Sequence, residues 1–182
     1  MKFNQNNIKR AIVSAFVVGS VGISAASYAD DTQMLVKTTV GASCIVSIDA
    51  SMTFADYDPV IAHATDDLLK QQNISAQCTT GAQAKIDLNV GLNPVDSTAT
   101  ISPSRRMKHI DTDNNVHYLN YNLYKGSDVA APVWGGGATG GKIYDGIGTA
   151  QNIIVYGRVG PNQPAVFNAT YTDTVVVSYN LG

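Results

Sequence analysis

The sequence predicts an all-β fold, a sandwich of immunoglobulin-like type with about seven strands. Three observations favour this class. Only 14% of the 182 residues are charged, and all 14 acidic residues are Asp, so the Glu-rich heptads of helical bundles are missing. Short segments in which apolar and polar residues alternate recur along the chain. Turn residues separate these segments, and no helix of about ten or more residues is predicted.

Residues 1–29 have the pattern of a secretory signal peptide. Three basic residues precede a largely apolar stretch, 11–26. Ser27-Tyr28-Ala29 follows it, with small residues at the positions expected for a cleavage site. A transmembrane anchor is the alternative, but Gly and Ser interrupt the stretch and it is shorter than the roughly 20 apolar residues of a spanning helix. Cleavage after Ala29 takes the net charge from −2 to −5. Because phosphate binding needs a basic face, we expect no nucleic-acid partner.

The two cysteines, Cys44 and Cys78, both lie in the predicted exported part of the chain. Exported proteins meet an oxidising environment, so we expect one disulfide between them. Two free thiols or half of a metal site are the alternatives, but there is no C-x-x-C motif and no suitably placed His. Closing a loop of roughly 34 residues would stabilise the folded state by about 4 kcal/mol.

The first segment with strand periodicity is 32–40. One face carries Met34, Val36, Thr38 and Val40, and the other face carries the residues between them. This period of two is typical of a β-strand.

Three further short strands are predicted in the first half of the mature chain. They are residues 44–48, 73–78 and 85–90. Residues 79–81, Thr-Thr-Gly, form the turn between the last two. The mixed stretch 56–69 could hold one helical turn, but Asp58-Pro59 favours a loop there.

The second half of the chain continues the same pattern. Residues 118–124 have one apolar face, and Val133-Trp134 forms a short strand before a glycine-rich loop. Strand 152–158 follows, and 171–181 is the longest of all. One face of this last strand carries Val175, Val177, Tyr179 and Leu181.

The last strand ends the chain without a turn or a returning strand. An unpaired edge strand as apolar as 171–181 invites association with another chain. Segment 32–40 has no turn signal before Gly41, so it has no evident partner either. Pairing of 32–40 with a second copy of the protein would satisfy both strands. In the alternative arrangement, 32–40 forms the first strand of its own sandwich.

A set of short motifs occurs in a fixed order over residues 41–182. The motifs are Gly41-Ala-Ser-Cys44, Phe54-x-x-Tyr57-Asp58-Pro59, Ile74-Ser-Ala-Gln-Cys78-Thr79-x-Gly81-Ala82, Arg106-Met107, Leu119-x-Tyr121-Asn122-Leu123-Tyr124, Val133-Trp134-Gly135, Val155-Tyr156-Gly157-Arg158-Val159 and Tyr171-x-Asp173-Thr174-Val175-x-Val177. In this order, and with the Cys pair, the mature chain resembles the spore coat protein U domain. This is the domain of archaic (Csu-type) chaperone-usher pilus subunits.

The resemblance implies an incomplete immunoglobulin-like β-sandwich that is completed by a donor strand from another subunit. It divides the chain into a signal peptide, 1–29, a donor segment, 30–42, and a pilin domain, 43–182. The implied donor residues are Met34, Val36, Thr38 and Val40, and the implied residues of the acceptor groove, which first binds the chaperone, are Val175, Val177, Tyr179 and Leu181. The family pattern has an aliphatic residue at the position of Thr38. The threonine makes this third anchor of the donor strand weaker by about 1 kcal/mol of lost burial.

The function that the resemblance implies is a structural subunit of a surface pilus, serving adhesion and biofilm formation. Its implied partners are other copies or related pilus subunits, a periplasmic chaperone and an outer-membrane usher. Donor and acceptor surfaces differ, so the contact is head-to-tail and produces a fibre. The alternatives are a secreted coat protein and an adhesive or capping subunit. Family tip adhesins carry an extra domain, for which the 153 residues after Ala29 leave no room.

Several patterns resemble those of enzymes or ligand sites. Residues 136–142 match the P-loop spacing, but Ile143 stands where Ser or Thr must reach Mg²⁺, so we expect no nucleotide. No G-x-S-x-G motif is present and both cysteines are expected to be bridged, so we expect no enzyme. The tyrosines and Trp134 are expected to serve the core and cross-strand pairs rather than a binding platform.

Two patterns resemble metal sites. Residues 111–115 imitate the start of an EF-hand loop, but Val116 replaces the required Gly and Asn122 the required Glu. A hairpin turn explains this segment. The three histidines, His63, His109 and His117, lack the spacing of metal ligands, so we expect neither a metal nor a cofactor.

Overall fold

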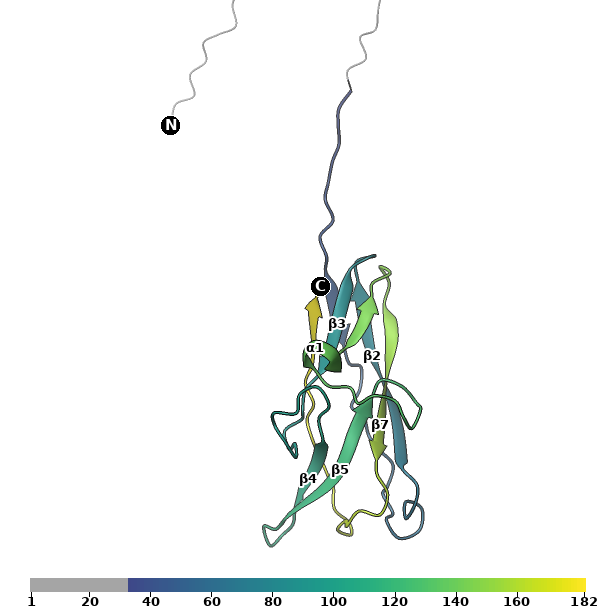
Figure 1. Cartoon of the computed structure of the whole chain (residues 1–182), viewed down its shortest axis with the longest axis vertical. Coiled ribbons are helices and arrows are strands. Elements are labelled where there is room, and N and C mark those ends of the chain that lie inside the picture. Colours follow the sequence, from purple (N-terminus) through teal and green to yellow (C-terminus); the bar gives the residue numbers. More distant parts are fainter. Residues whose placement is uncertain (1–32) are drawn as a thin grey trace, which may run out of the picture. The chain divides into compact units, whose positions relative to one another are not determined.

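The computed structural model describes residues 33–182, so the predicted signal peptide and residues 30–32 lie outside it. Eight strands form two antiparallel sheets, one with the order β1-β2-β7-β5-β4 and one with the order β6-β3-β8 (Figure 1). The elements are β1 (Cys44–Ser47), β2 (Leu68–Cys78), β3 (Gln83–Leu88), β4 (Arg105–Ile110), β5 (Val116–Tyr124), a single helical turn α1 (Gly137–Gly140), β6 (Lys142–Asp145), β7 (Gln151–Val159) and β8 (Val177–Leu181). The all-β, immunoglobulin-like fold class is confirmed.

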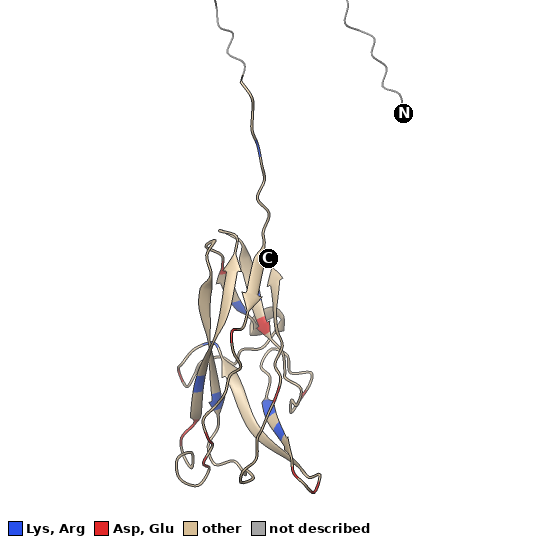
Figure 2. Cartoon of the chain, turned by 180° about the vertical axis from the view of Figure 1, so that it is seen from behind, with Lys and Arg blue, Asp and Glu red and all other residues tan. Residues whose placement is uncertain are grey.

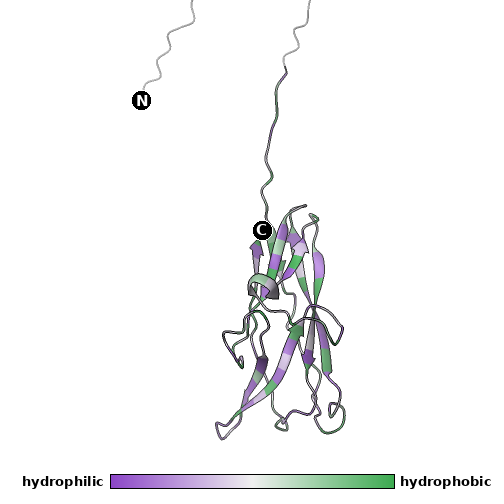
Figure 3. Cartoon of the chain, in the orientation of Figure 1, coloured by the Kyte–Doolittle hydropathy of each residue, from purple (hydrophilic) through white to green (hydrophobic). Residues whose placement is uncertain are grey.

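The core lies between the two sheets. Apolar and polar residues alternate along the strands, as the hydropathy colours show (Figure 3). Ile74 of β2, Ile86 of β3 and Val155 of β7 are buried. Trp134 is completely buried, and its indole Nε1 donates a hydrogen bond to the carbonyl oxygen of Ile86 at 2.9 Å. This bond satisfies the polar atom of the largest side chain in the core.

A disulfide joins Cys44 to Cys78. The two residues lie directly opposite each other in the antiparallel pairing of β1 with β2. Because β1 is short and lies at the edge of its sheet, the bridge anchors it to the much longer β2.

Several strand predictions differ from the structure. Strands β4 and β6 were not predicted, and β2 begins at Leu68 rather than at residue 73. Val133 forms only an isolated bridge to Tyr124 rather than a strand. The possible helical turn before β2 is absent, and residues 59–63 form a turn that is followed by a bend over 64–66. These segments lack clear alternation, so the local sequence pattern does not reveal how they pair.

The predicted first and last strands also differ. Residues 33–40 belong to no strand, and the side chains of Met34, Val36 and Val40 are 84%, 81% and 76% exposed. The last strand is shorter than predicted, because regular pairing with β3 begins only at Val177.

The turn between β4 and β5 is organised by Asp111, which explains the EF-hand-like pattern. One of its carboxylate oxygens accepts hydrogen bonds from the backbone N–H groups of Asp113 and Asn115 at 2.9 and 2.8 Å. The other lies 2.9 Å from Nε2 of His117 and accepts a bond from the Asn115 side chain. These bonds, that to His117 first, hold the pKa of Asp111 well below its usual range.

We expect Asp111→Ala to lower the melting temperature at pH 7. An ionised carboxylate with a depressed pKa stabilises the fold above the unfolded pKa of about 3.9, and this contribution is lost as the pH falls through the lower folded value. The difference between wild type and variant should therefore shrink below about pH 4. Thermal unfolding at several pH values measures it. Asp113→Ala is the matched control, since it removes the same charge from the same turn, and an equal effect of both variants would contradict the prediction.

Within residues 33–182, no helix is long and apolar enough to cross a bilayer.

Candidate functional site

The sandwich is open along one side, where a groove of about 1010 Å³ runs between the two sheets. One rim is the segment 48–57, which continues from β1. The other rim is the segment 169–177, which leads into β8. Neither rim segment forms a regular strand before Val177, so the groove separates two extended segments that have no ladder between them.

The first rim rests on β7 through two large side chains. Met52 and Phe54 are half-buried and pack against the core. They lie over Gly157 of β7, where an added Cβ would collide with Phe54 Cζ at 2.7 Å and with the Met52 sulfur. Tyr57 ends this rim, and its hydroxyl donates a hydrogen bond to the carbonyl oxygen of Gly160 at 2.9 Å. The missing side chain of Gly157 therefore makes room for the rim.

The second rim has one face toward the core. Its half-buried residues alternate with exposed ones, and the half-buried set is Tyr171, Asp173, Val175 and Val177. The backbone N–H and C=O groups of Val176 bond to Asn89, and those of Thr172 bond to Lys108. Since successive residues of an extended chain direct these groups to opposite sides, the backbone groups of Asp173 and Val175 point toward the groove. This rim therefore offers an unpaired strand edge.

The floor of the groove is apolar. Its residues come from both sheets and are buried: Leu68, Ile74, Leu88, Leu119, Tyr121, Leu123, Val155 and Val159. A floor of this composition binds apolar side chains, and an unpaired strand edge binds extended backbone. The groove thus has the two features needed to receive a β-strand that is apolar on one face.

A polar cluster interrupts the apolar lining beside the second rim. The Asp173 carboxylate accepts hydrogen bonds from the Tyr121 hydroxyl at 2.7 Å, the Leu92 N–H at 2.9 Å and the Asn93 side chain at 3.2 Å. Burial, and then the bond to Asp173, raise the pKa of Tyr121. Arg105 is 1% exposed, and burial lowers its pKa to about 10, so it remains charged at neutral pH.

The structure places the predicted groove residues at two different locations. Val175 and Val177 line the groove, whereas Tyr179 and Leu181 lie outside its lining. The Tyr179 hydroxyl donates a hydrogen bond to the carbonyl oxygen of Cys44 at 2.9 Å and so links the edge strands β8 and β1. Leu181 pairs with Ala84 of β3.

Sequence reasoning did not identify the other rim or the polar cluster. Met52 and Phe54 alternate in the sequence and could have been found from that period of two. Asp173 appeared only as part of a family motif, and its place in the groove depends on contacts with Tyr121 and Leu92, which are distant in the sequence.

The patterns that resembled ligand sites have structural roles. The glycine-rich segment forms the single turn α1, and the strand β6 follows it rather than a helix. Nδ1 of His63 accepts a hydrogen bond from the Asp58 N–H, and the rings of His109 and His117 lie 6.2 Å apart on paired strands. Among the described residues, no cluster of three potential metal ligands is found.

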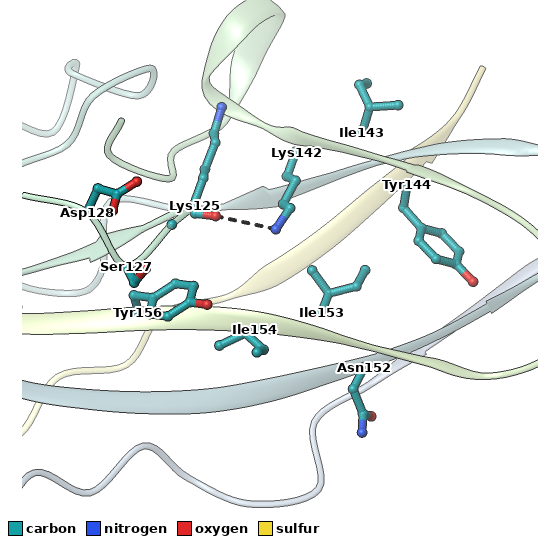
Figure 4. Close-up of a pocket in the computed structure, with 11 residues that line it drawn as sticks. Lys125, Ser127, Asp128, Lys142, Ile143, Tyr144, Asn152, Ile153, Ile154 and Tyr156 are labelled. Carbon is teal, nitrogen blue, oxygen red and sulfur yellow. Dashed lines mark hydrogen bonds between the residues drawn. The ribbon is translucent and has the colours of Figure 1, made fainter. Parts of the chain in front are cut away.

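A smaller hollow of about 420 Å³ lies between β6 and β7 (Figure 4). The ammonium groups of its two lysines donate hydrogen bonds to backbone carbonyl oxygens. Lys142 Nζ donates to the carbonyl oxygen of Lys125, and Lys125 Nζ donates to those of Thr139 and Gly141. These bonds hold neighbouring loops together. Basic and acidic residues are spread over several strands and loops of the domain (Figure 2).

The fold and the groove define a class of protein, an immunoglobulin-like domain that is open along one edge. The chain belongs to the Spore Coat Protein U domain family, whose model matches residues 30–178. It is 34% identical over 181 residues to Protein U of Myxococcus xanthus, covering 95% of this chain and 98% of that protein.

Among solved structures, the chain is similar to one in the CsuC–CsuE chaperone–tip adhesion subunit pre-assembly complex from archaic chaperone-usher Csu pili of Acinetobacter baumannii. The TM-score is 0.48 and the sequence identity is 21%. The match covers 78% of this chain but only 40% of the other.

Proposed function

We propose that this protein is a structural subunit of a surface pilus and that it polymerises by donor-strand exchange. The observation that carries the proposal is the open groove, with its apolar floor and unpaired strand edge. In this proposal, residues 30–42 of one copy fill the groove of the next, and residues 43–182 form the acceptor domain. The donor side chains Met34, Val36 and Val40 are exposed in the isolated chain and become buried in the neighbour.

Export supports the same proposal. The family match begins at residue 30, directly after the cleavage site expected at Ala29. A periplasmic chaperone would occupy the groove first, and an outer-membrane usher would exchange it for the next subunit. The finished fibre would lie on the cell surface and serve adhesion and biofilm formation.

The double substitution of Val36 and Val40 by Asp should stop polymerisation while leaving the domain folded. Each change would place an unpaired carboxylate in the apolar groove of the neighbour, at a cost of several kcal/mol. Both side chains are exposed in the isolated chain, so the domain itself loses no packing. The amount of high-molecular-weight polymer recovered from the cell surface measures the effect.

The matched control is Leu35→Asp with Thr39→Asp, which adds the same charges to the opposite face of the donor segment. We expect this control to polymerise. Normal polymer from the Val36 and Val40 variant would contradict the donor assignment.

A secreted coat protein is the second candidate function. It is favoured by the description of the family as a Spore Coat Protein U domain, together with the match to Protein U over nearly the whole of that relative. The two candidates differ in their partners, because only the pilus subunit requires a chaperone and an usher. Co-purification of the periplasmic form with a chaperone, or its absence, distinguishes them.

A further inference from the structure

One rim of the groove carries a single charged side chain among its inward-facing residues. These residues are Tyr171, Asp173, Val175 and Val177. Asp173 is half-buried beside the apolar lining of the groove, and its carboxylate accepts hydrogen bonds from Tyr121, Leu92 and Asn93. A bound strand that covers this rim therefore either supplies a donor to the remaining acceptor position of Asp173 or shields that position from water without one.

The donor face has one polar side chain as well. Met34, Val36 and Val40 are apolar, whereas Thr38 carries a hydroxyl that can donate one hydrogen bond. A fully apolar groove would not favour a hydroxyl at this position. The donor face thus has one polar side chain, Thr38, and the rim has one charged side chain, Asp173.

The geometry of the rim restricts how the donor can pair. The sheet that contains β8 is antiparallel throughout, so a strand added at its free edge is expected to run antiparallel to β8. The side-chain period of two then requires that donor residues of even number lie opposite rim residues of odd number, or the apolar face would point to solvent. Successive allowed registers differ by two residues.

Three registers place the donor along the groove. In the first, Thr38 lies opposite Asp173, and the remaining pairs are Met34 with Val177, Val36 with Val175 and Val40 with Tyr171. A shift by two residues in either direction places Val36 or Val40 opposite the Asp173 carboxylate. Only the first register brings the two polar side chains together and leaves every apolar donor residue opposite an apolar or aromatic one.

We propose that Thr38 of one subunit pairs with Asp173 of the next and that this polar pair sets the register of the donor strand. The inference rests on the proposed function. The carboxylate can accept about four hydrogen bonds and already accepts three, from Tyr121, Leu92 and Asn93. One acceptor position is therefore left for the Thr38 hydroxyl. Thr38 accordingly specifies the register of the donor strand. This role explains why the position carries a hydroxyl and not an aliphatic side chain.

Disulfide trapping in the full-length protein measures the register directly. The pair Val36→Cys with Val175→Cys reports the proposed register, and each shifted register has its own pair, Met34→Cys with Val175→Cys or Val36→Cys with Val177→Cys. Opposed residues lie about 5.5 Å apart, within disulfide reach, whereas diagonal neighbours lie about 7–8 Å apart. The polymer is examined on non-reducing gels, with the single-cysteine variants as controls.

We expect the proposed pair to give a ladder of covalent oligomers with about tenfold more cross-linking than either shifted pair, because the diagonal distance exceeds disulfide geometry. A ladder from a shifted pair instead would overturn the register while leaving donor-strand exchange in place. If even the wild-type chain formed no polymer, the proposed function itself would fail. The two failures are thus distinguishable.

The Thr38→Val variant tests whether the polar pair is the cause of the register. Without the hydroxyl, the donor face is uniformly apolar and the shifted registers become comparable in energy. We expect polymer to form, but with the cross-linking preference reduced several-fold and spread over the three cysteine pairs. Unchanged preference for the proposed pair in Thr38→Val polymers would show that Thr38 does not set the register. Thr38→Ser, which retains the hydroxyl, should keep the preference of the wild type.

Discussion

Arg105→Leu should destabilise the domain by roughly 3–5 kcal/mol, because it removes the charged partner from a buried hydrogen-bond network. The guanidinium of Arg105 is buried and donates to the carbonyl oxygens of Leu88, Asn89 and Trp134. These carbonyls belong to the end of β3 and to the segment before α1, so one side chain of β4 joins the two sheets. Leucine is smaller than arginine and carries no donor, so it leaves all three carbonyls without their partner. Urea denaturation with the disulfide intact measures the difference.

Arg106→Leu is the matched control for this prediction. Arg106 is the next residue on the same strand, and its guanidinium donates to Asn93 and Pro94 while stacking over the ring of Tyr118 at 4.1 Å. It is only half-buried, so water can replace its bonds and the loss should be about 1 kcal/mol. Equal destabilisation by the two variants would contradict the role given to the buried guanidinium. Arg105→Lys should be intermediate, because an ammonium group keeps the charge but cannot reproduce the fork.

Arg105 also explains why part of the fold was not predictable. Strand β4 reads Arg-Arg-Met-Lys-His-Ile, and three of its first four residues are basic, so its sequence has no apolar face. The strand forms because distant carbonyl groups satisfy a buried charge, and no local pattern records this. Strand β5 has alternating apolar residues and a buried face, so it was predicted within two residues of its start.

The candidate site also contains residues that the local sequence predicts and residues whose place depends on distant contacts. Val175 and Val177 could be placed on the groove side from their alternation, which depends only on the local period of two. Tyr179 has the same parity but bonds to Cys44 across the two sheets, a contact that parity alone cannot reveal. Gly157 accommodates Met52 and Phe54, which lie about a hundred residues earlier in the chain, so its role cannot be predicted from its sequence neighbours.

Appending a second copy of residues 31–42 after Gly182, through a flexible linker of a few residues, should raise the melting temperature of the full-length chain by roughly 10–20 °C. The added strand would fill the groove from the same molecule and bury three aliphatic side chains at about 1.5–3 kcal/mol each. Ordering the strand offsets part of this gain. For a domain of this size, a net gain of about 5 kcal/mol corresponds to the stated shift at roughly 2–4 °C per kcal/mol.

In the proposed register, a linker of a few residues is long enough to connect Gly182 to the appended strand. Gly182 lies beside the start of β3, where its N–H donates to the carbonyl oxygen of Gln83. A strand that returns antiparallel to β8 would place Met34 of the copy opposite Val177, so only a short hairpin has to be closed. The appended copy should also block polymerisation, because its groove is no longer free for a neighbour.

The control is the same extension with both Val36 and Val40 of the appended copy replaced by Asp. It has equal length and equal linker entropy but cannot enter the apolar groove, so its melting temperature should match that of the unextended chain. If the two extensions had equal stability, the groove would not be a strand-binding site and the sandwich would be complete without a donor. If only the intact extension is stabilised and remains monomeric, the groove and the donor segment are complementary halves of one interface.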